Sequence, residues 1–245
     1  MSNYDSNFIN IELTRNTVYI YSVRKLLQRA IDKNLKNFKG ILLDLGCGEM
    51  PYREYLMVKN KKIRRYIGMD VNYNNYHNFV KPDMVWDGEK IGLSDKQVNT
   101  VIATELFEHV PNIEKVLREI SRVLSDDGIL FFTVPFIWPL HETPFDEFRY
   151  TPYSLKRFLK KAGFQKIKIA TLGQYNASLA QMICIWIFNQ NNLRKSYFQE
   201  IFFHLFEKFI LFPIIKKLLI MDKKERIINY GENTIPTGFY VYAKK

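Results

Sequence analysis

The sequence predicts an α/β protein built on a doubly wound, mostly parallel sheet of seven strands. Short apolar runs alternate along the chain with segments whose apolar residues recur at helical spacing. The run over 128–135 is apolar almost throughout, which is typical of a strand covered by helices on both faces. Parallel strands joined through helices form right-handed crossovers, so we expect a ligand at the carboxyl ends of the strands.

The expected helices and strands alternate from the first helix onward. Apolar residues at helical spacing predict this helix over 17–38, and Gly40 follows it as a stop signal. Further helices are expected over 51–58, 113–124 and 152–162. The seven strands are expected over 41–45, 65–71, 84–89, 98–104, 128–135, 164–170 and 237–243.

Composition limits the class of protein. The 245 residues, 47% of them hydrophobic and 25% charged, suffice for one globular α/β domain with an appendage. Two cysteines give no disulfide framework, and the polar residues 1–10 lack a signal-peptide pattern, so we expect a cytoplasmic protein. A net charge of +11 favours an acidic partner, either nucleic acid, an anionic membrane surface or a phosphorylated substrate. The alternative is that the clusters of lysine and arginine are only solvated faces.

A glycine motif follows the first expected strand. Gly46 and Gly48 let the backbone pass close beneath a ligand where a Cβ would collide. A dinucleotide fingerprint needs a third glycine where Pro51 stands, and Asp44 is a poor neighbour for a pyrophosphate. Both departures favour a ligand that is cationic at this point. Cys47 is interpreted as a small residue between the glycines and not as a nucleophile.

At these residues the chain resembles the class I S-adenosylmethionine-dependent methyltransferases of the type 11 group, whose first motif reads Leu-Asp-x-Gly-Cys-Gly. The resemblance covers about 38–172 and the last strand, with four motifs in order. It implies S-adenosylmethionine as cofactor, its ribose held by Asp70 and its adenine near Asp87, although Asp-Gly is also an ordinary turn signal. The implied cofactor-binding residues are Asp44, Gly46, Cys47, Gly48, Asp70, Val71, Asp87, Gly88, Thr104, Glu105 and His109.

Two acids after the fourth expected strand have alternative roles. Glu105 and Glu108 could offset the charge of the sulfonium or cap the helix that follows. We expect Glu105 to lie near the cofactor and Glu108 to cap the helix. His109 is expected to shape the pocket, with a purely structural role as the alternative.

The segment 135–152 is expected to bind the acceptor. It resembles the His-Glu-x-Pro-x-Asp-x-x-Arg-Tyr-Thr-Pro loop of bacterial methyltransferases of surface-sugar and glycolipid assembly. His141 is the expected general base, with a loop-ordering hydrogen bond as the alternative, and Asp146 with Arg149 could form a structural ion pair. No His/Cys cluster occurs at ligand spacing, so no metal is expected. The candidate catalytic residues are His141, Glu142, Asp146, Arg149 and Tyr150.

The expected domain organisation separates an apolar insertion from the rest. Residues 1–173 and 236–245 form the S-adenosylmethionine-binding domain, and 174–235 form an apolar helical insertion. Its apolar runs are shorter than the about 20 residues that span a bilayer. The insertion could cap the active site or, through its flanking lysines, lie on the anionic inner face of a membrane.

The expected function is O-methylation of a sugar, glycolipid or other small acceptor, phosphorylated acceptors included, in cell-surface polysaccharide biosynthesis. A nucleic-acid methyltransferase is the first alternative, but 104–107 read Thr-Glu-Leu-Phe, without the Pro-Pro motif that grips a flipped base. The second alternative is a non-catalytic, membrane-associated assembly factor that keeps the fold. The motif acids Asp44, Asp70 and Asp87 argue for retained cofactor binding.

Overall fold

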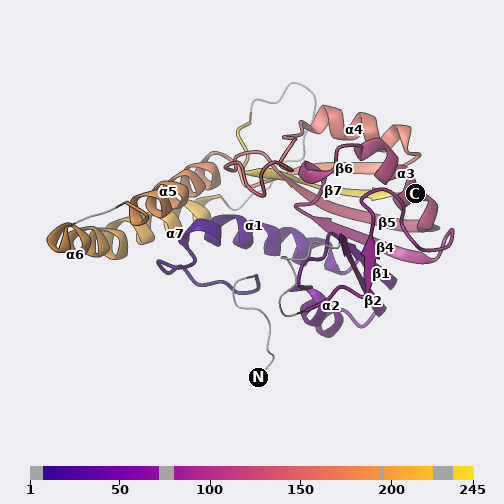
Figure 1. Cartoon of the computed structure of the whole chain (residues 1–245), viewed down its shortest axis with the longest axis horizontal. Helices are drawn as coiled ribbons and strands as arrows, with labels where there is room; N and C mark the ends of the chain where they lie inside the picture. The colour runs from indigo at the N-terminus through magenta and orange to yellow at the C-terminus, as the bar shows by residue number, and fades with distance from the viewer. Residues whose placement is uncertain (1–7, 72–79, 194–195, 223–233) are drawn as a thin grey trace.

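The computed structural model describes residues 8–71, 80–193, 196–222 and 234–245. Seven strands form one sheet in the order β3-β2-β1-β4-β5-β7-β6, in which β7 alone is antiparallel to its neighbours (Figure 1). This confirms the predicted doubly wound, mostly parallel sheet. The strands are β1 Gly40–Leu45, β2 Ile63–Val71, β3 Met84–Trp86, β4 Val98–Thr104, β5 Leu124–Pro135, β6 Gln165–Leu172 and β7 Gly238–Lys244.

Helices cover both faces of this sheet. Side chains alternate along a strand, so Leu42 packs into the core shared with α1 and α2, and Leu43 into the core shared with α3 and α4. Both leucines are fully buried. The helices on these faces are α1 Val18–Leu35, α2 Arg53–Lys59, α3 Ile113–Val123 and α4 Pro152–Lys161, with a 3-10 turn η1 at Phe107–His109.

Element boundaries differ from the prediction by a few residues. The largest difference is at β5, which begins at Leu124 although the strand is expected to begin at residue 128. The pairing of β5 with β4 shifts register between Val98 and Thr100, which takes up the extra residues.

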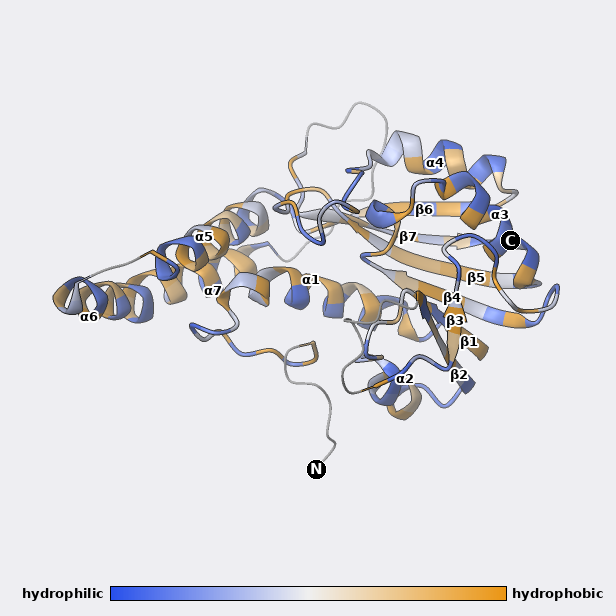
Figure 2. Cartoon of the chain, viewed as in Figure 1, coloured by the Kyte–Doolittle hydropathy of each residue, from blue (hydrophilic) through white to orange (hydrophobic). Residues whose placement is uncertain are grey.

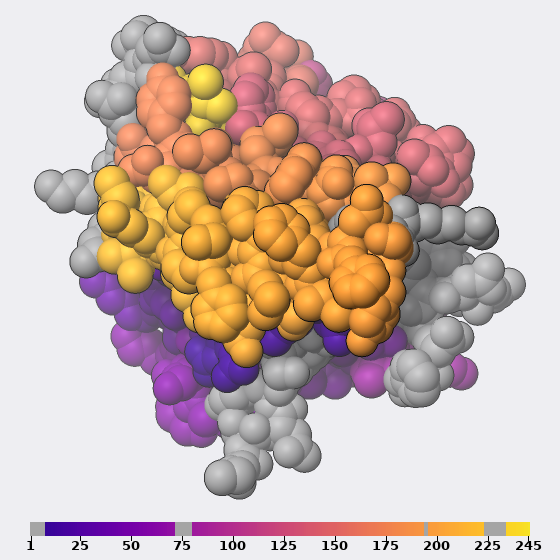
Figure 3. Space-filling view, turned by 90° about the vertical axis from the view of Figure 1, so that its left-hand side faces the viewer, coloured from indigo at the N-terminus to yellow at the C-terminus, as the bar shows by residue number. Residues whose placement is uncertain are grey.

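The predicted insertion is helical where it is described, and residues 194–195 and 223–233 lie outside the described residues. Its helices project from one end of the sheet as an arm, and Figure 3 shows them covering that end of the molecule. Ala180, Cys184 and Ile215 of the arm share the core of α1. The elements of the arm are α5 Tyr175–Asn191, α6 Tyr197–Phe206, the π-helical η2 Glu207–Leu211 and α7 Phe212–Met221.

Candidate functional site

A cavity of about 550 Å³ opens at the carboxyl ends of β1, β2 and β4. Ligands of doubly wound sheets bind at this edge. The sheet side of the wall comes from the glycine loop, the end of β2 and the end of β4, while α1 and the loop after β5 close the other sides. The predicted site residues on the wall are Gly46, Cys47, Gly48, Asp70, Val71, Thr104, Glu105, His109, His141 and Glu142.

The glycine loop has the conformation that its sequence predicts. Gly46 and Gly48 have φ values of +72° and +51°, in the left-handed region that favours glycine. A Cβ on Gly46 would lie 2.7 Å from Leu106, whereas a Cβ on Gly48 would meet no protein atom within 4 Å. The N–H of Gly48 donates to Oδ2 of Asp70 at 2.6 Å, which fixes the loop against the end of β2. The open space at Gly48 is therefore available to a ligand.

Asp44 lies beneath this loop and not on the cavity wall. Its side chain is buried, one oxygen accepts a hydrogen bond from the Tyr66 hydroxyl, and the other has no partner among the described residues. Burial raises the pKa of Asp44 to about 7, against the lowering effect of the Tyr66 hydrogen bond. Cys47 is also buried, and burial raises the pKa of its thiol. A reactive thiolate is therefore not favoured at Cys47.

The two acids expected to bind ribose and adenine are placed differently. Asp70 lies on the cavity wall, where its second oxygen accepts from the N–H of Val71 at 2.7 Å. Asp87 and Gly88 lie outside the cavity wall, and Asp87 is exposed. The Asp87 carboxylate accepts from the backbone N–H of Glu89 and of the next residue, as in an ordinary Asx turn, and these bonds lower its pKa.

Glu105 directly follows β4 on the cavity wall and has an unusual backbone conformation. Its φ of +52° lies in the left-handed region, and its N–H donates to the carbonyl and hydroxyl oxygens of Thr133. Burial raises the pKa of the Glu105 carboxyl, while Thr133 and Arg24 lower it. Sites that hold such strained residues are frequently functional. Glu105 therefore offers a carboxylate to the cavity close to the glycine loop.

The loop after β5 holds His141 through a chain of charged groups. Nδ1 of His141 lies 3.0 Å from Oδ2 of Asp146, and Arg149 donates to both oxygens of Asp146 at 2.5 and 2.8 Å. Burial alone would raise the pKa of Asp146, but hydrogen bonds from Arg149 and from the His141 backbone hold it at about 2. Arg149 also donates to the carbonyl oxygen of Trp138. Asp146 therefore combines a hydrogen bond to His141 with an ion pair to Arg149 that orders the loop.

The remaining loop residues are split between the cavity and the core. Glu142 lies on the cavity wall, and one of its oxygens is 3.8 Å from Nε2 of His109. Tyr150 lies outside the cavity wall and is buried, with its hydroxyl donating to the Phe107 carbonyl at 3.1 Å. Its pKa is raised by burial. The contacts of Tyr150 are those of a residue that anchors the loop.

The prediction that Glu108 caps the next helix is wrong. Asn112 is the N-cap of α3 and accepts a hydrogen bond from the N–H of Lys115. Glu108 is instead 0% exposed and points into the protein beside His109, because η1 turns the chain back toward the sheet.

The sequence does not predict that α1 contributes to the site. The cavity wall includes Tyr19 and Arg24 of α1, together with Trp138 of the loop after β5. The helical periodicity of this segment shows that one face is buried but not what it faces. The described residues of the arm contribute nothing to the wall, so α1 provides the cover that a capping insertion would provide.

The sequence model of the protein family described as a methyltransferase domain matches residues 43–132 of this chain. An uncharacterized protein of Methanocaldococcus jannaschii is 28% identical over 148 residues, covering 60% of this chain and 53% of that protein. The ubiquinone biosynthesis O-methyltransferase of Pelagibacter ubique is 30% identical over 111 residues, covering 42% of this chain and 44% of that enzyme. This chain spans about half the length of the curated relatives it matches.

The whole architecture also matches solved structures. The crystal structure of a SAM-dependent methyltransferase from Archaeoglobus fulgidus aligns with a TM-score of 0.53 and 20% sequence identity, covering 95% of each chain. At this level of identity the similarity shows the fold alone. The shared fold is the mostly parallel sheet of seven strands with flanking helices.

Proposed function

The chain carries a class I S-adenosylmethionine-dependent methyltransferase domain, and we propose that it transfers the methyl group of this cofactor to an oxygen of a small acceptor. One observation carries the proposal. A single cavity joins the glycine loop and Asp70, which suit a nucleoside, to His141, whose Nδ1 is bound to a carboxylate. A binding site for the cofactor and a group able to act on an acceptor hydroxyl therefore face the same space.

The cofactor half of the cavity supports a cationic nucleoside. Ribose hydroxyls are hydrogen-bond donors that the Asp70 carboxylate can accept. The open space above Gly48 admits the bulk of the ligand. The Glu105 carboxyl lies on the cavity wall, where a bound sulfonium would favour its charged form against the effect of burial. Among the described residues, Asp87 is not part of the cavity wall, so its proposed role at the adenine rests on the resemblance alone.

Methyl transfer from a sulfonium requires alignment of the acceptor oxygen, the methyl carbon and the sulfur. The acceptor oxygen bonds to the methyl carbon as the carbon–sulfur bond breaks, and the electron pair of that bond stays on sulfur. An alcohol must also lose its proton. We propose that His141 activates the hydroxyl, with Asp146 and Arg149 as positioning residues that fix the imidazole.

The acceptor class is proposed from two similarities. The loop that contains His141 resembles that of methyltransferases of surface-sugar and glycolipid assembly, and one relative is named as an O-methyltransferase of ubiquinone biosynthesis. Both favour an oxygen of a sugar, glycolipid or other small molecule. The proposed pathway is cell-surface polysaccharide biosynthesis.

The test combines calorimetry with isotope-labelled methyl transfer. The protein should bind S-adenosylmethionine, and labelled methyl groups should enter the lipid or polysaccharide fraction of a cell extract. His141→Asn should bind the cofactor within about twofold of the original protein and lose about a hundredfold or more in turnover. His204→Asn, on the arm, serves as the matched control. Label in the nucleic-acid fraction would contradict the proposed acceptor, and absence of cofactor binding would favour an assembly factor.

We also propose that the arm lies on an anionic membrane surface. Several of its large apolar side chains are exposed, with Phe198 at 82% and Phe202 at 72%. Figure 2 shows hydrophobic and hydrophilic residues interspersed along α5, α6 and α7. Among the described residues, none of the helices combines the length and the hydropathy that crossing a bilayer requires. Aromatic side chains beside lysines are typical of interfacial helices.

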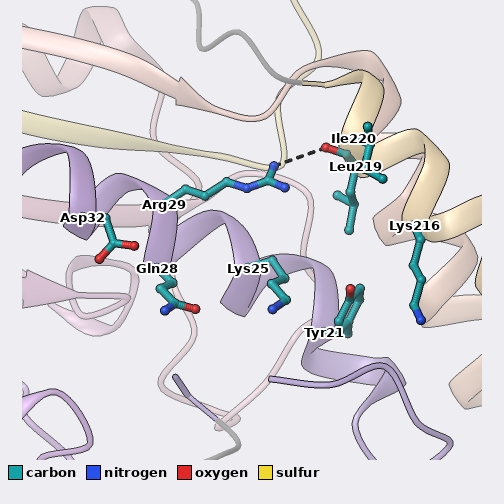
Figure 4. Close-up of a pocket in the computed structure, with 8 residues that line it drawn as sticks. All are labelled: Tyr21, Lys25, Gln28, Arg29, Asp32, Lys216, Leu219 and Ile220. Atoms are coloured by element: carbon teal, nitrogen blue, oxygen red, sulfur yellow. Dashed lines mark hydrogen bonds between the residues drawn. The ribbon is translucent and has the colours of Figure 1, made fainter. Parts of the chain in front are cut away.

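A basic pocket adjoins the apolar surface of the arm. It has a volume of about 430 Å³ between α1 and α7, and Figure 4 shows Lys25, Arg29 and Lys216 around it. Arg29 donates to the Leu219 carbonyl at 3.2 Å, which holds its guanidinium at the pocket. Ile220 in the same wall is 55% exposed, so cationic and apolar groups adjoin as the boundary of an anionic bilayer requires.

Vesicle co-sedimentation tests this proposal on the full chain, because the arm shares the core of α1 and cannot be removed cleanly. The protein should bind vesicles that contain phosphatidylglycerol and bind pure phosphatidylcholine vesicles weakly. Phe198→Glu with Phe202→Glu should abolish binding, while Val58→Glu, at an exposed valine of α2, should not. The proposal would be contradicted if the original protein dimerised without binding vesicles and the same arm variants abolished the dimer. The partner of the arm would then be a second copy of the chain.

A further inference from the structure

His109 and His141 line the cavity, and the buried Glu108 lies beside them, although His141 is far along the chain from the other two. One carboxylate oxygen and one ring nitrogen from each histidine all lie within 4.8 Å of one another. The 3-10 turn η1 after β4 supplies two of these groups, and the loop after β5 supplies the third. We propose that this cluster binds a divalent transition-metal ion beside the acceptor. The sequence predicts no metal because these residues do not form a cluster along the chain.

Both histidines are oriented as metal ligands are. Nδ1 of His109 lies 3.1 Å from the Phe145 carbonyl oxygen, which can only accept, so this nitrogen carries the proton. Nδ1 of His141 is held in the same way by the Asp146 carboxylate at 3.0 Å. Each Nε2 therefore keeps its lone pair. A carbonyl or carboxylate behind the far ring nitrogen is the usual outer shell of a histidine that ligates metal.

Glu108 is the independent observation that points to a cation. It is 0% exposed, and among the described residues neither of its carboxylate oxygens has a hydrogen-bond partner. The buried oxygen Oε1 lies 3.9 Å from Nε2 of His109. A buried carboxyl group without hydrogen bonds destabilises the folded state unless it is protonated, is paired with a cation or coordinates a metal. A cation between Glu108 and the two histidines would satisfy it.

The donor set selects the class of ion. Two imidazole nitrogens with a carboxylate suit Zn²⁺, Mn²⁺, Co²⁺ or Fe²⁺ better than Mg²⁺ or Ca²⁺, which prefer oxygen ligands. Glu142, with an oxygen 3.8 Å from Nε2 of His109, can contribute a further oxygen from the cavity side. Three or four protein ligands leave coordination positions open toward the cavity for water or an acceptor oxygen.

The use of this ion rests on the proposed function. A divalent cation lowers the pKa of a bound hydroxyl, so the acceptor can lose its proton near neutral pH. With Nε2 bound to the ion, His141 activates the acceptor by holding the ion and does not take the proton itself. The proton passes to solvent by way of the partly exposed Glu142. The acceptor oxygen next takes the methyl group from the sulfonium, whose sulfur keeps the bonding electron pair. No oxidation or reduction occurs.

Metal binding is tested on the full chain after treatment with a chelator and removal of the chelator. Titration with Co²⁺, followed by its visible absorption, and with Zn²⁺ by calorimetry should give one saturable equivalent. Glu108→Gln and His141→Asn should each weaken binding by about a hundredfold or more, and Asp146→Asn by about ten- to a hundredfold through the outer shell. His204→Asn, whose imidazole lies outside the cluster, should bind as the original protein does.

The variants also separate a lost site from a lost fold. Zn²⁺ should raise the melting temperature of the original protein but not that of Glu108→Gln, whose circular dichroism should be unchanged. No saturable binding by the original protein, or equal binding by Glu108→Gln and His141→Asn, would overturn the proposal. Full methyl transfer by metal-depleted protein would overturn the catalytic use of the ion. Metal binding without cofactor binding would instead overturn the proposed function.

Discussion

Replacement of Asp44 by Asn tests whether the acid of the glycine motif is held neutral in the folded protein. The pKa of Asp44 is raised from 3.8 to about 7, chiefly by burial and against the Tyr66 hydrogen bond. The unfolded chain therefore releases this proton at a lower pH than the folded chain does. As the pH rises from the unfolded pKa to the folded pKa of Asp44, the unfolding free energy should fall by about 1.4 kcal/mol per pH unit, or about 4 kcal/mol in all.

Asp44→Asn removes this titration and keeps an oxygen for the Tyr66 hydroxyl. Relative to the original protein, the variant should therefore gain stability as the pH rises from about 4 to about 7, by up to about 4 kcal/mol, and gain no more above that. Urea unfolding of both proteins at about pH 4.5 and about pH 8 measures the difference. All other titrating groups are common to both proteins and cancel.

Asp87→Asn is the matched control, because Asp87 is exposed and backbone hydrogen bonds lower its pKa. The stabilising effect of that carboxylate is present above its unfolded pKa and lost as the pH falls, so its removal acts in the opposite direction. If Asp44→Asn differed from the original protein by the same amount at both pH values, Asp44 would titrate alike in both states and the argument from burial would fail.

Two further predictions concern the glycine loop and Asp70. Gly46→Ala should destabilise the protein, because its Cβ would lie 2.7 Å from Leu106 at a left-handed φ. Gly48→Ala should cost only about 1 kcal/mol in urea unfolding, since its Cβ meets no protein atom, but should weaken S-adenosylmethionine binding in calorimetry. Asp70→Asn should weaken that binding about tenfold or more while the Gly48 hydrogen bond persists, and unchanged affinity would remove Asp70 from the ribose site.

The sequence predicts the sheet well because its evidence is local. Apolar runs and the glycine loop carry their own geometry, so the strand positions follow within a few residues. The side-chain contacts that link His141 to Arg149 through Asp146 lie within one short loop. Both predicted alternatives, a hydrogen bond to His141 and an ion pair, are present.

The parts that sequence analysis missed depend on contacts between distant segments. The helical pattern of α1 gives a buried face but cannot show that Tyr19 and Arg24 lie on the cavity wall. Glu108 follows a strand and precedes a helix, where a capping role is the simplest local interpretation. Its burial beside His141 depends on how β4 and β5 pair, which places the end of one strand next to the loop that follows the other.

The buried acids around the cavity share one physical property. Among the described residues, one carboxyl oxygen of Asp44 and one of Glu105 lack a hydrogen-bond partner, and both carboxyl oxygens of Glu108 do. Such groups destabilise a fold unless they are neutral or a cation reaches them. The cofactor sulfonium and the proposed metal ion are the two cations that the cavity would admit. Each should therefore stabilise the protein beyond what its contacts with neutral groups explain, and the demethylated product, which lacks the positive sulfur, should stabilise it less than the cofactor does.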